Sequence, residues 1–128
     1  VAARARKKIE TTFDLVAIIE AAVPRAYRKG RLHGATRTFQ ALRITVNDEL
    51  GALKVGLAAG FRKLKTSSRM AVISFHSLED RIVKNFFKQL KEENKAVLIN
   101  KKPIIPQEEE IKSNPRSRSA KLRIISRL

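Results

Sequence analysis

Residues 69–84, RMAVISFHSLEDRIVK, constrain the fold more than any other part of this sequence. Met70–Ile73 and Phe75 form an apolar run with almost no polar alternation, which predicts a strand covered on both faces in a parallel α/β sheet. Polar and ionisable side chains then crowd the carboxyl end of this strand, where open α/β sheets bind their ligands. These side chains are Ser74, His76, Ser77, Glu79 and Asp80. We therefore expect an α/β domain with candidate site residues at this strand end.

A helix is predicted directly after the strand. Ser77 is expected to cap it, with Asp80 three residues later completing a capping box. Apolar residues recur at helical spacing through the segment and predict its buried face. They are Ile82, Val83, Phe86, Phe87 and Leu90.

The rest of the chain is predicted to hold further helices and two short strands. Thr11 and Asp14 have the spacing of a capping box, which predicts a helix that ends at Pro24. Helical periodicity resumes at Thr36 and continues to about residue 64, broken or bent near Gly51. Strands are expected at residues 96–99 and 121–126, and a helical turn at 107–112. The basic, glycine-containing segment 25–35 is the best candidate for a domain boundary.

Charge and composition narrow the class of partner. Lys and Arg number 28 against 12 Asp and Glu, so the net charge of +16 indicates a polyanionic partner. The absence of cysteine excludes disulfides and Cys-based zinc sites, and we predict no metal. No apolar run approaches the roughly 20 residues of a membrane span, so we expect a soluble, cytoplasmic protein without a membrane partner. The chain begins at Val1 within a basic, alanine-rich stretch, and we expect it to be part of a longer protein.

Several long phrases resemble the C-terminal part of the ribosomal RNA small subunit methyltransferase H family. The resemblance runs from about Ile9 to the end of the chain. It rests on ETTFDLVAIIEAAVP at 10–24, HGATRTFQALRITVNDEL at 33–50, AVISFHSLEDRIVKNFF at 71–87, KKPIIP at 101–106 and NPRSRSAKLR at 114–123. One departure is the turn at 65–68, where KTSS replaces the Pro-Gly-Gly that the family usually has.

The resemblance implies a fold class and a reaction. The fold would be α/β, the C-terminal half of a Rossmann-like class I methyltransferase domain, preceded by the end of an all-helical insertion. Residues 1–34 would end the RNA-recognition insertion and its basic loop, and residues 35–128 would form the C-terminal part of the catalytic domain. The family transfers a methyl group from S-adenosylmethionine to the N4 amine of a cytosine in 16S rRNA of the small ribosomal subunit.

The resemblance assigns no residue of this chain to the cofactor. The family's glycine-rich cofactor loop precedes the region that matches, and none of the five glycines here follows a strand in a GxGxxG pattern. We therefore expect the chain alone to be inactive, with no catalytic residue assignable.

Two segments supply candidate contacts to the target base or its sugar. At the end of the predicted strand we expect Ser74, His76 and Ser77 to contact the nucleotide, with Glu79 and Asp80 orienting Arg81 or the neighbouring loop. The alternative for His76 is a structural histidine bonded to backbone or to Asp80. In the segment after Thr36, the candidates for contact with phosphate or base are Arg37, Thr38, Arg43 and Asn47. Thr36 and Thr38 would otherwise be caps, Arg43 would pair on the helix surface, and Asn47 would be a buried structural amide.

The segment 114–121 is the strongest electrostatic candidate. Short serines between arginines let a loop approach a phosphate closely while the guanidinium groups bind its oxygens. The candidates are Asn114, Arg116, Ser117, Arg118, Ser119 and Lys121. The alternative is a solvated basic turn or an internal ion pair of Arg118 with Glu79 or Glu109.

Two other classes of function compete with the methyltransferase interpretation. A Ser–His–Asp hydrolase built from Ser74 or Ser77, His76 and Asp80 is disfavoured, because adjacent residues do not easily form that line and no G-x-S-x-G turn is present. A non-catalytic basic RNA-binding module is what composition alone would favour. In either case we expect the exposed edge and face of the predicted strand at 70–75 to promote homo-oligomerisation or aggregation.

Overall fold

The computed structural model describes residues 1–24 and 33–128. It separates into two compact units, Val1–Asp48 and Glu49–Leu128. Most of the predicted boundary loop, residues 25–32, lies outside the described residues, so the predicted division at residue 34 stays a prediction.

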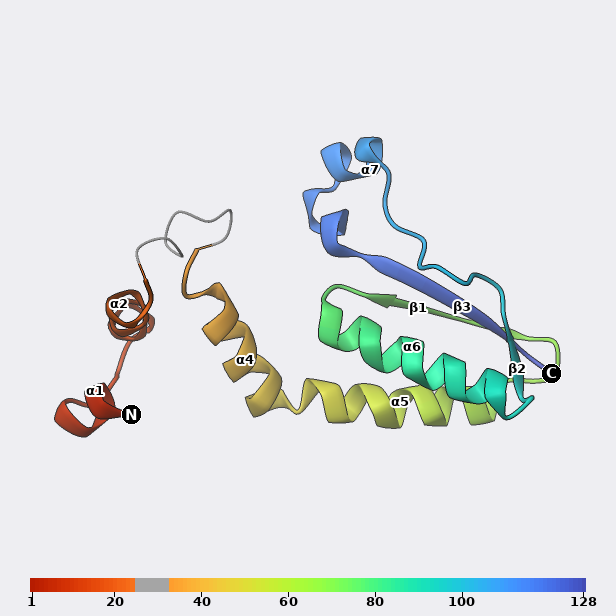
Figure 1. Cartoon of the computed structure of the whole chain (residues 1–128), viewed down its shortest axis with the longest axis horizontal. Coiled ribbons are helices and arrows are strands. Elements are labelled where there is room, and N and C mark those ends of the chain that lie inside the picture. The colour runs from red at the N-terminus through yellow and green to blue at the C-terminus, as the bar shows by residue number, and fades with distance from the viewer. Residues whose placement is uncertain (25–32) are drawn as a thin grey trace. The chain divides into compact units, whose positions relative to one another are not determined.

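The first unit is helical, with α1 at Ala2–Arg6, α2 at Thr12–Ala22 and α4 at Thr36–Asn47 (Figure 1). The predicted capping box starts α2: Thr11 Oγ1 accepts from the Asp14 N–H at 3.1 Å, and the Asp14 carboxylate accepts from the Thr11 N–H at 3.0 Å. The side-chain and backbone hydrogen bonds from Thr11 lower the pKa of Asp14. The helix ends just before Pro24, as its sequence predicts.

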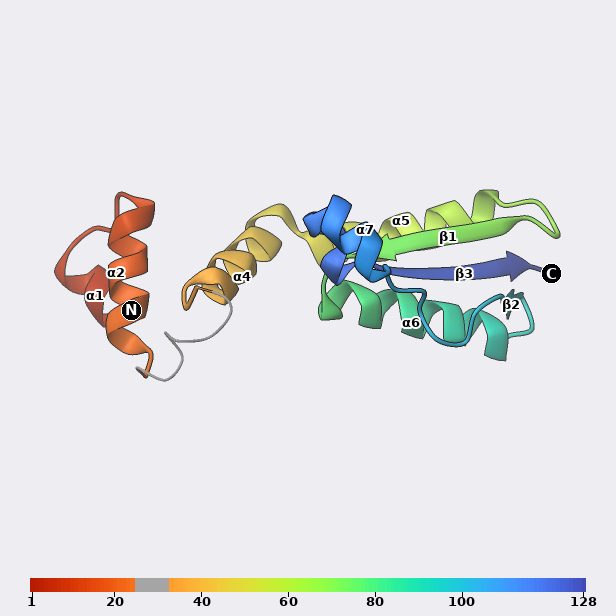
Figure 2. The ribbon, with the colours of Figure 1, turned by 90° about the horizontal axis from the view of Figure 1, so that it is seen from above.

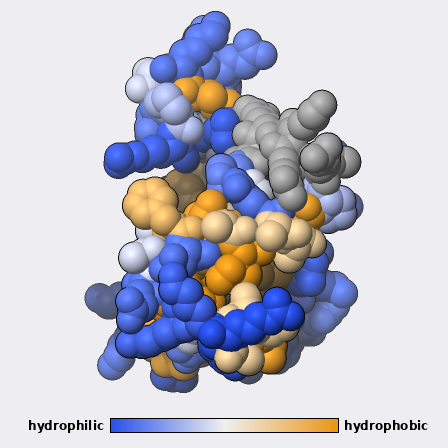
Figure 3. Space-filling view, turned by 90° about the vertical axis from the view of Figure 1, so that its left-hand side faces the viewer, coloured by the Kyte–Doolittle hydropathy of each residue, from blue (hydrophilic) through white to orange (hydrophobic). Residues whose placement is uncertain are grey.

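Part of the apolar surface of α2 faces solvent. Only Ile19 is buried in this helix, and Phe13 is 82% exposed. Figure 3 shows apolar side chains gathered among hydrophilic ones on the face that it presents. A helix that is apolar on several sides is normally covered by other protein.

The long helical segment predicted after Thr36 is interrupted at Asp48. Helix α4 ends there, and α5 runs over Glu49–Lys63, so the break predicted near Gly51 is confirmed and lies three residues before that glycine. Asp48 has a left-handed φ of 46°. Aspartate tolerates this conformation better than most non-glycine residues, because its short side chain can bond locally.

The second unit holds a three-stranded sheet. Its strands are β1 at Arg69–Ser74, β2 at Ala96–Leu98 and β3 at Lys121–Arg127, in the order β1-β3-β2. The central strand β3 is antiparallel to both neighbours, so β1 and β2 run parallel to each other on either side of it. The α/β class is confirmed, but the prediction of a parallel sheet is wrong for these strands. The reason is that the chain returns through α7 at Glu108–Ser113 and η1 at Pro115–Ser119 and places β3 between the other two strands.

Helices α5 and α6, the latter at Ser77–Glu92, cover one face of the sheet (Figures 1 and 2). The most deeply buried large side chains are Phe87 and Val83 of α6 and Ile125 of β3. Burying a side chain of this size stabilises the fold by about 1.5–3 kcal/mol. The predicted buried face of α6 is therefore confirmed for its central residues.

The other face of the sheet is left uncovered by the residues that the structure describes. Ile73 and Phe75 are 58% and 54% exposed, and Ile104 and Ile105 from the segment before α7 are also exposed. The expectation that the first strand is covered on both faces is therefore wrong for this chain. The expectation of an exposed strand face is confirmed.

Two details fix the ends of α5 and β1. Arg127 Nη1 donates to the carbonyl oxygens of Phe61, Arg62 and Leu64 at 3.3, 3.2 and 2.6 Å, and so ties β3 to the last turn of α5. The turn before β1 contains Ser67 with a left-handed φ of 64°. Glycine adopts this conformation without steric cost, whereas serine does not.

Candidate nucleic-acid interface

The carboxyl end of β1 passes directly into a capped helix. His76 is the N-cap of α6: its Nδ1 accepts from the Glu79 N–H at 3.3 Å, and the Glu79 carboxylate accepts from the Phe75 and His76 N–H groups at 2.9 and 3.3 Å. The predicted cap, Ser77 with Asp80, is therefore wrong by one residue. A histidine ring nitrogen caps the helix here, where a serine hydroxyl was expected to do so. No simple sequence pattern indicates a histidine cap.

His76 is mostly buried and only partly satisfied. Its side chain is 13% exposed, and because Nδ1 accepts a hydrogen bond, the neutral ring carries its proton on Nε2. That nitrogen lies 3.4 Å from Glu79 Oε1 but has no hydrogen-bond partner in the described part of the chain. The structural alternative for His76, a bond to backbone at the strand–helix turn, is thus realised, while its contact with a nucleotide stays a prediction.

Ser74 and Ser77 differ sharply in exposure. Ser74 is buried, and its hydroxyl lies 3.5 Å from the Lys121 carbonyl oxygen of the neighbouring strand. Ser77 and Arg81 are exposed on the first turns of α6. Of the residues predicted at this strand end, the serine at 77 and the arginine at 81 are accessible to a ligand without rearrangement.

Asp80 forms the most buried ion pair that the structure describes. Its Oδ1 lies 2.7 Å from Arg123 Nε and its Oδ2 lies 3.2 Å from Arg123 Nη2, with Lys121 Nζ at 3.4 Å from Oδ2. The Arg123 hydrogen bond holds the pKa of the Asp80 carboxyl below its ordinary value, against the opposing effect of burial. A carboxylate held in this way is a poor proton acceptor, and it ties α6 to β3, while the orientation of Arg81 or the neighbouring loop by Asp80 stays a prediction.

Arg123 was not among the predicted site residues. Side chains alternate between the two faces along the last strand, so Lys121, Arg123 and Ile125 lie on one face, towards α6. This alternation is the sequence signal that could have identified Arg123. An arginine on that face needs a buried acid, and Asp80 supplies it.

The segment 114–121 is a 3₁₀ turn followed by the start of β3, where a loop was predicted. The Asn114 carbonyl oxygen accepts from the Ser117 N–H at 3.0 Å and from the Ser117 hydroxyl at 2.8 Å, and Ser117 is buried. Arg116, Arg118 and Ser119 are exposed. Neither arginine forms an ion pair with a residue that the structure describes, so the internal pairing of Arg118 with Glu79 or Glu109 is not formed.

The predicted contacts on α4 lie at opposite ends of that helix. Arg37 is exposed in the first turn, and the Thr38 N–H donates to the Ala35 carbonyl oxygen at 3.0 Å. Asn47 is exposed at the last position of α4, about 15 Å of helix rise from Arg37. Asn47 thus lies outside the first turns of α4, and the alternative that it is a buried structural amide is wrong.

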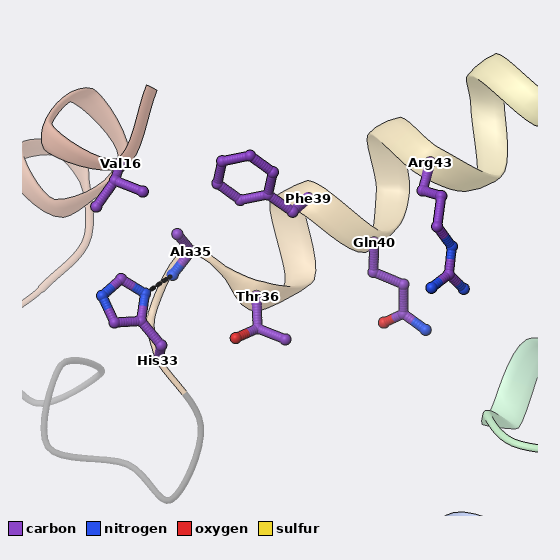
Figure 4. Close-up of a pocket in the computed structure, with 7 residues that line it drawn as sticks. All are labelled: Val16, His33, Ala35, Thr36, Phe39, Gln40 and Arg43. Atoms are coloured by element: carbon purple, nitrogen blue, oxygen red, sulfur yellow. Dashed lines mark hydrogen bonds between the residues drawn. The ribbon is translucent and has the colours of Figure 1, made fainter. Parts of the chain in front are cut away.

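A cavity of about 540 Å³ lies within the first unit, beside the first turns of α4 (Figure 4). Its lining is Val16, His33, Ala35, Thr36, Phe39, Gln40 and Arg43. His33 Nδ1 accepts from the Ala35 N–H at 3.2 Å, and His33 Nε2 lies 3.2 Å from Glu20 Oε1. Sequence reasoning identified Arg43 in this group but not His33 or Gln40, because neither follows a recognisable spacing.

Two classes of site find no support in the described ranges. They contain no group of three His, Cys, Asp or Glu side chains that could hold a metal ion. No helix within them is long and apolar enough to cross a membrane.

The sequence of this chain matches the model of the MraW methylase family over residues 1–128. The chain belongs to that family. It is 51% identical to the ribosomal RNA small subunit methyltransferase H of Persephonella marina and 53% identical to that of Elusimicrobium minutum, in each case over all of this chain. The corresponding protein of Acetivibrio thermocellus is 48% identical over an alignment of 143 residues.

The chain spans less than half the length of these curated relatives, between 43% and 46%, and corresponds to their C-terminal part. The resemblance seen in the sequence phrases is confirmed.

The end of β1 offers few free backbone donors. The backbone N–H groups of Phe75 and His76 at the end of β1 are already bonded to Glu79. No glycine-rich turn follows any of the strands.

Proposed function

We propose that this chain forms the C-terminal portion of an S-adenosylmethionine-dependent methyltransferase that modifies the N4 amine of a cytosine in 16S rRNA. The observation that carries the proposal is the match of the whole chain, at about half identity, to proteins named ribosomal RNA small subunit methyltransferase H. The net charge of +16 supports an RNA partner. The setting would be the cytoplasm, and the partner the small ribosomal subunit or its rRNA.

In this proposal the chain binds and positions RNA. Methyl transfer to an aromatic amine depends chiefly on alignment of the reacting atoms and on exclusion of water. We assign phosphate binding to the exposed turn at 114–121, with Arg116 and Arg118 as the charged groups. The contacts near the base would come from Ser77 and His76 at the end of β1, and further RNA contacts from Arg37, Thr38 and Asn47 of α4.

We further propose that the 128 residues alone do not transfer methyl groups. The cofactor would be held by the family's glycine-rich loop, which has no counterpart among these residues. Self-association through the unpaired edge and apolar outer face of β1 is part of the same proposal, because such surfaces are normally covered.

The test is transfer of labelled methyl groups from S-adenosylmethionine to small-subunit rRNA particles. The chain alone is compared with the chain joined to the N-terminal part of a family member. Activity only in the joined form is the expected result. Activity of the chain alone would show that the cofactor site has been misplaced.

A non-catalytic RNA-binding module is the second candidate. The exposed, unpaired arginines of η1 favour it, because they bind phosphate without any need for catalysis. Salt-sensitive RNA binding by both forms, with no methyl transfer by either, would establish this alternative.

A further inference from the structure

A basic groove lies in the second unit, between α6 and the segment that follows β2. Its volume is about 510 Å³. Its lining is Lys84, Phe87, Lys88, Lys91, Glu92, Leu98, Asn100, Lys101 and Arg123. None of the four lysines was among the predicted site residues, so the groove is additional to the turn at 114–121.

The lysines of α6 form a single stripe. Lys84, Lys88 and Lys91 are spaced by four and three residues, which places them on one side of the helix over a rise of about 10 Å. All three are exposed. The stripe spans about three steps between successive phosphates at the rise of about 3.4 Å that one strand has in a duplex, and fewer steps of a more extended strand.

The cations of the groove are only partly neutralised. Lys88 Nζ lies 3.3 Å from Glu92 Oε1, and the Arg123 guanidinium pairs with the Asp80 carboxylate. Lys84, Lys91 and Lys101 have no carboxylate partner within the described ranges. Three uncompensated positive charges thus border one cavity.

Side-chain hydrogen bonds hold the far wall of the groove to the sheet. The Asn100 side chain donates to the carbonyl oxygens of Lys102 and Leu122 at 2.7 and 3.2 Å and accepts from the Ile124 N–H at 2.8 Å. These bonds fasten the segment that carries Lys101 to β3. The floor between the two walls includes buried Phe87 and half-buried Leu98, an apolar surface on which a ribose or base can pack.

We propose that this groove binds the sugar–phosphate backbone of a single-stranded segment of the RNA substrate. Lys84, Lys91 and Lys101 contact its phosphates, and Leu98 packs against a sugar or base. The inference rests on the proposed function for the choice of RNA over an acidic peptide. A lysine ammonium is a point charge and lacks the rigid, two-pronged donor geometry of an arginine guanidinium. It therefore suits a phosphate backbone that is bound without regard to base sequence.

The experiment measures binding of a fluorescent ten-nucleotide oligouridylate by anisotropy at several salt concentrations. One variant carries Lys84→Gln, Lys91→Gln and Lys101→Gln. A matched control carries Lys54→Gln, Lys63→Gln and Lys65→Gln, which removes the same charge from exposed positions outside the groove. Circular dichroism establishes that both variants are folded.

The groove variant is expected to bind the RNA about tenfold more weakly. The slope of log affinity against log salt concentration is expected to become shallower by about 2, because each of three lost phosphate contacts contributes roughly 0.7. The control is expected to change affinity by less than about twofold. Equal loss in both variants, or no loss in the groove variant, would overturn the proposal. Displacement of the RNA by polyglutamate at an equal concentration of charge would also overturn it, in favour of an acidic peptide.

The methyl-transfer assay on the joined form separates this inference from the proposed function. If the groove variant binds RNA more weakly than the control but the joined form transfers no methyl groups, the groove assignment stands and the enzymatic proposal is removed. Methyl transfer by the joined form, with equal RNA binding by the groove variant and the control, would do the reverse.

Discussion

Asp80→Ala should remove the main ion pair between α6 and β3. The carboxylate and the Arg123 guanidinium are 13% and 10% exposed, and two hydrogen bonds of 2.7 and 3.2 Å join them. Removing one partner of a buried pair leaves the other charge unpaired and costs about 3–5 kcal/mol. Because the pair retains slight exposure, we expect the lower end of this range, about 3 kcal/mol.

The assay is urea unfolding at pH 7, followed by far-UV circular dichroism because the chain has no tryptophan. With an m-value of about 1.5 kcal/mol per molar, the midpoint should fall by about 2 M. Arg123→Met and the double variant complete a mutant cycle. The double variant should be more stable than Asp80→Ala, since no charge is then left buried without a partner.

The pH dependence gives a second readout of the same pair. The pKa of Asp80 is lower in the folded protein, so the stabilisation is fully present above the unfolded pKa and is lost as pH falls through the folded pKa. Stability curves of the wild type and Asp80→Ala should therefore converge below about pH 4. A destabilisation under about 1 kcal/mol at pH 7, or additive single effects in the cycle, would refute the reasoning.

Three further changes test other parts of the structure. Phe87→Ala should cost about 3–5 kcal/mol, because it leaves a cavity in the core between α6 and the sheet; thermal unfolding measures this, and a loss below about 1 kcal/mol would contradict the assigned burial. Ser67→Gly should stabilise the protein by about 0.5 kcal/mol, because it relieves a left-handed backbone at a modest entropic cost; a lower midpoint in urea would show that the turn is unstrained. Ile73→Lys should reduce self-association in analytical ultracentrifugation, because it places a charge on the exposed face of β1; an unchanged distribution of species would assign association to another surface.

The sequence predicts the local elements well and their pairing poorly. The capping box at Thr11, the apolar face of α6 and the strand at 121–127 all follow from spacing within a few residues. The antiparallel insertion of β3 between β1 and β2 depends on the path of the chain over residues 99–120. The sequence of this segment has no periodic pattern from which that path can be predicted. Strand order is set by contacts between segments distant in sequence, and propensity does not contain that information.

The candidate site shows the same division. Exposed basic residues such as Arg116 and Arg118 can be found from composition, because no carboxylate in the described ranges 1–24 and 33–128 pairs with them. His76 as an N-cap, and Asp80 as the partner of Arg123, could not be identified, because each role depends on a residue that the fold brings into place. The lysines of the groove were missed because Lys84 and Lys91 read as an ordinary solvated helix face.

The position of β3 has a consequence for synthesis on the ribosome. This strand lies at the centre of the sheet, yet it is the last of the three to be translated, and β1 is made about fifty residues before the partner that it needs. Until residues 121–127 emerge, the nascent chain presents two unpaired strands, and the last turn of α5 lacks its bonds to Arg127. During this interval the exposed strands are open to pairing with other chains. Translation rate over the codons for residues 99–127, and chaperones that act while these residues are made, should therefore govern the yield of folded protein.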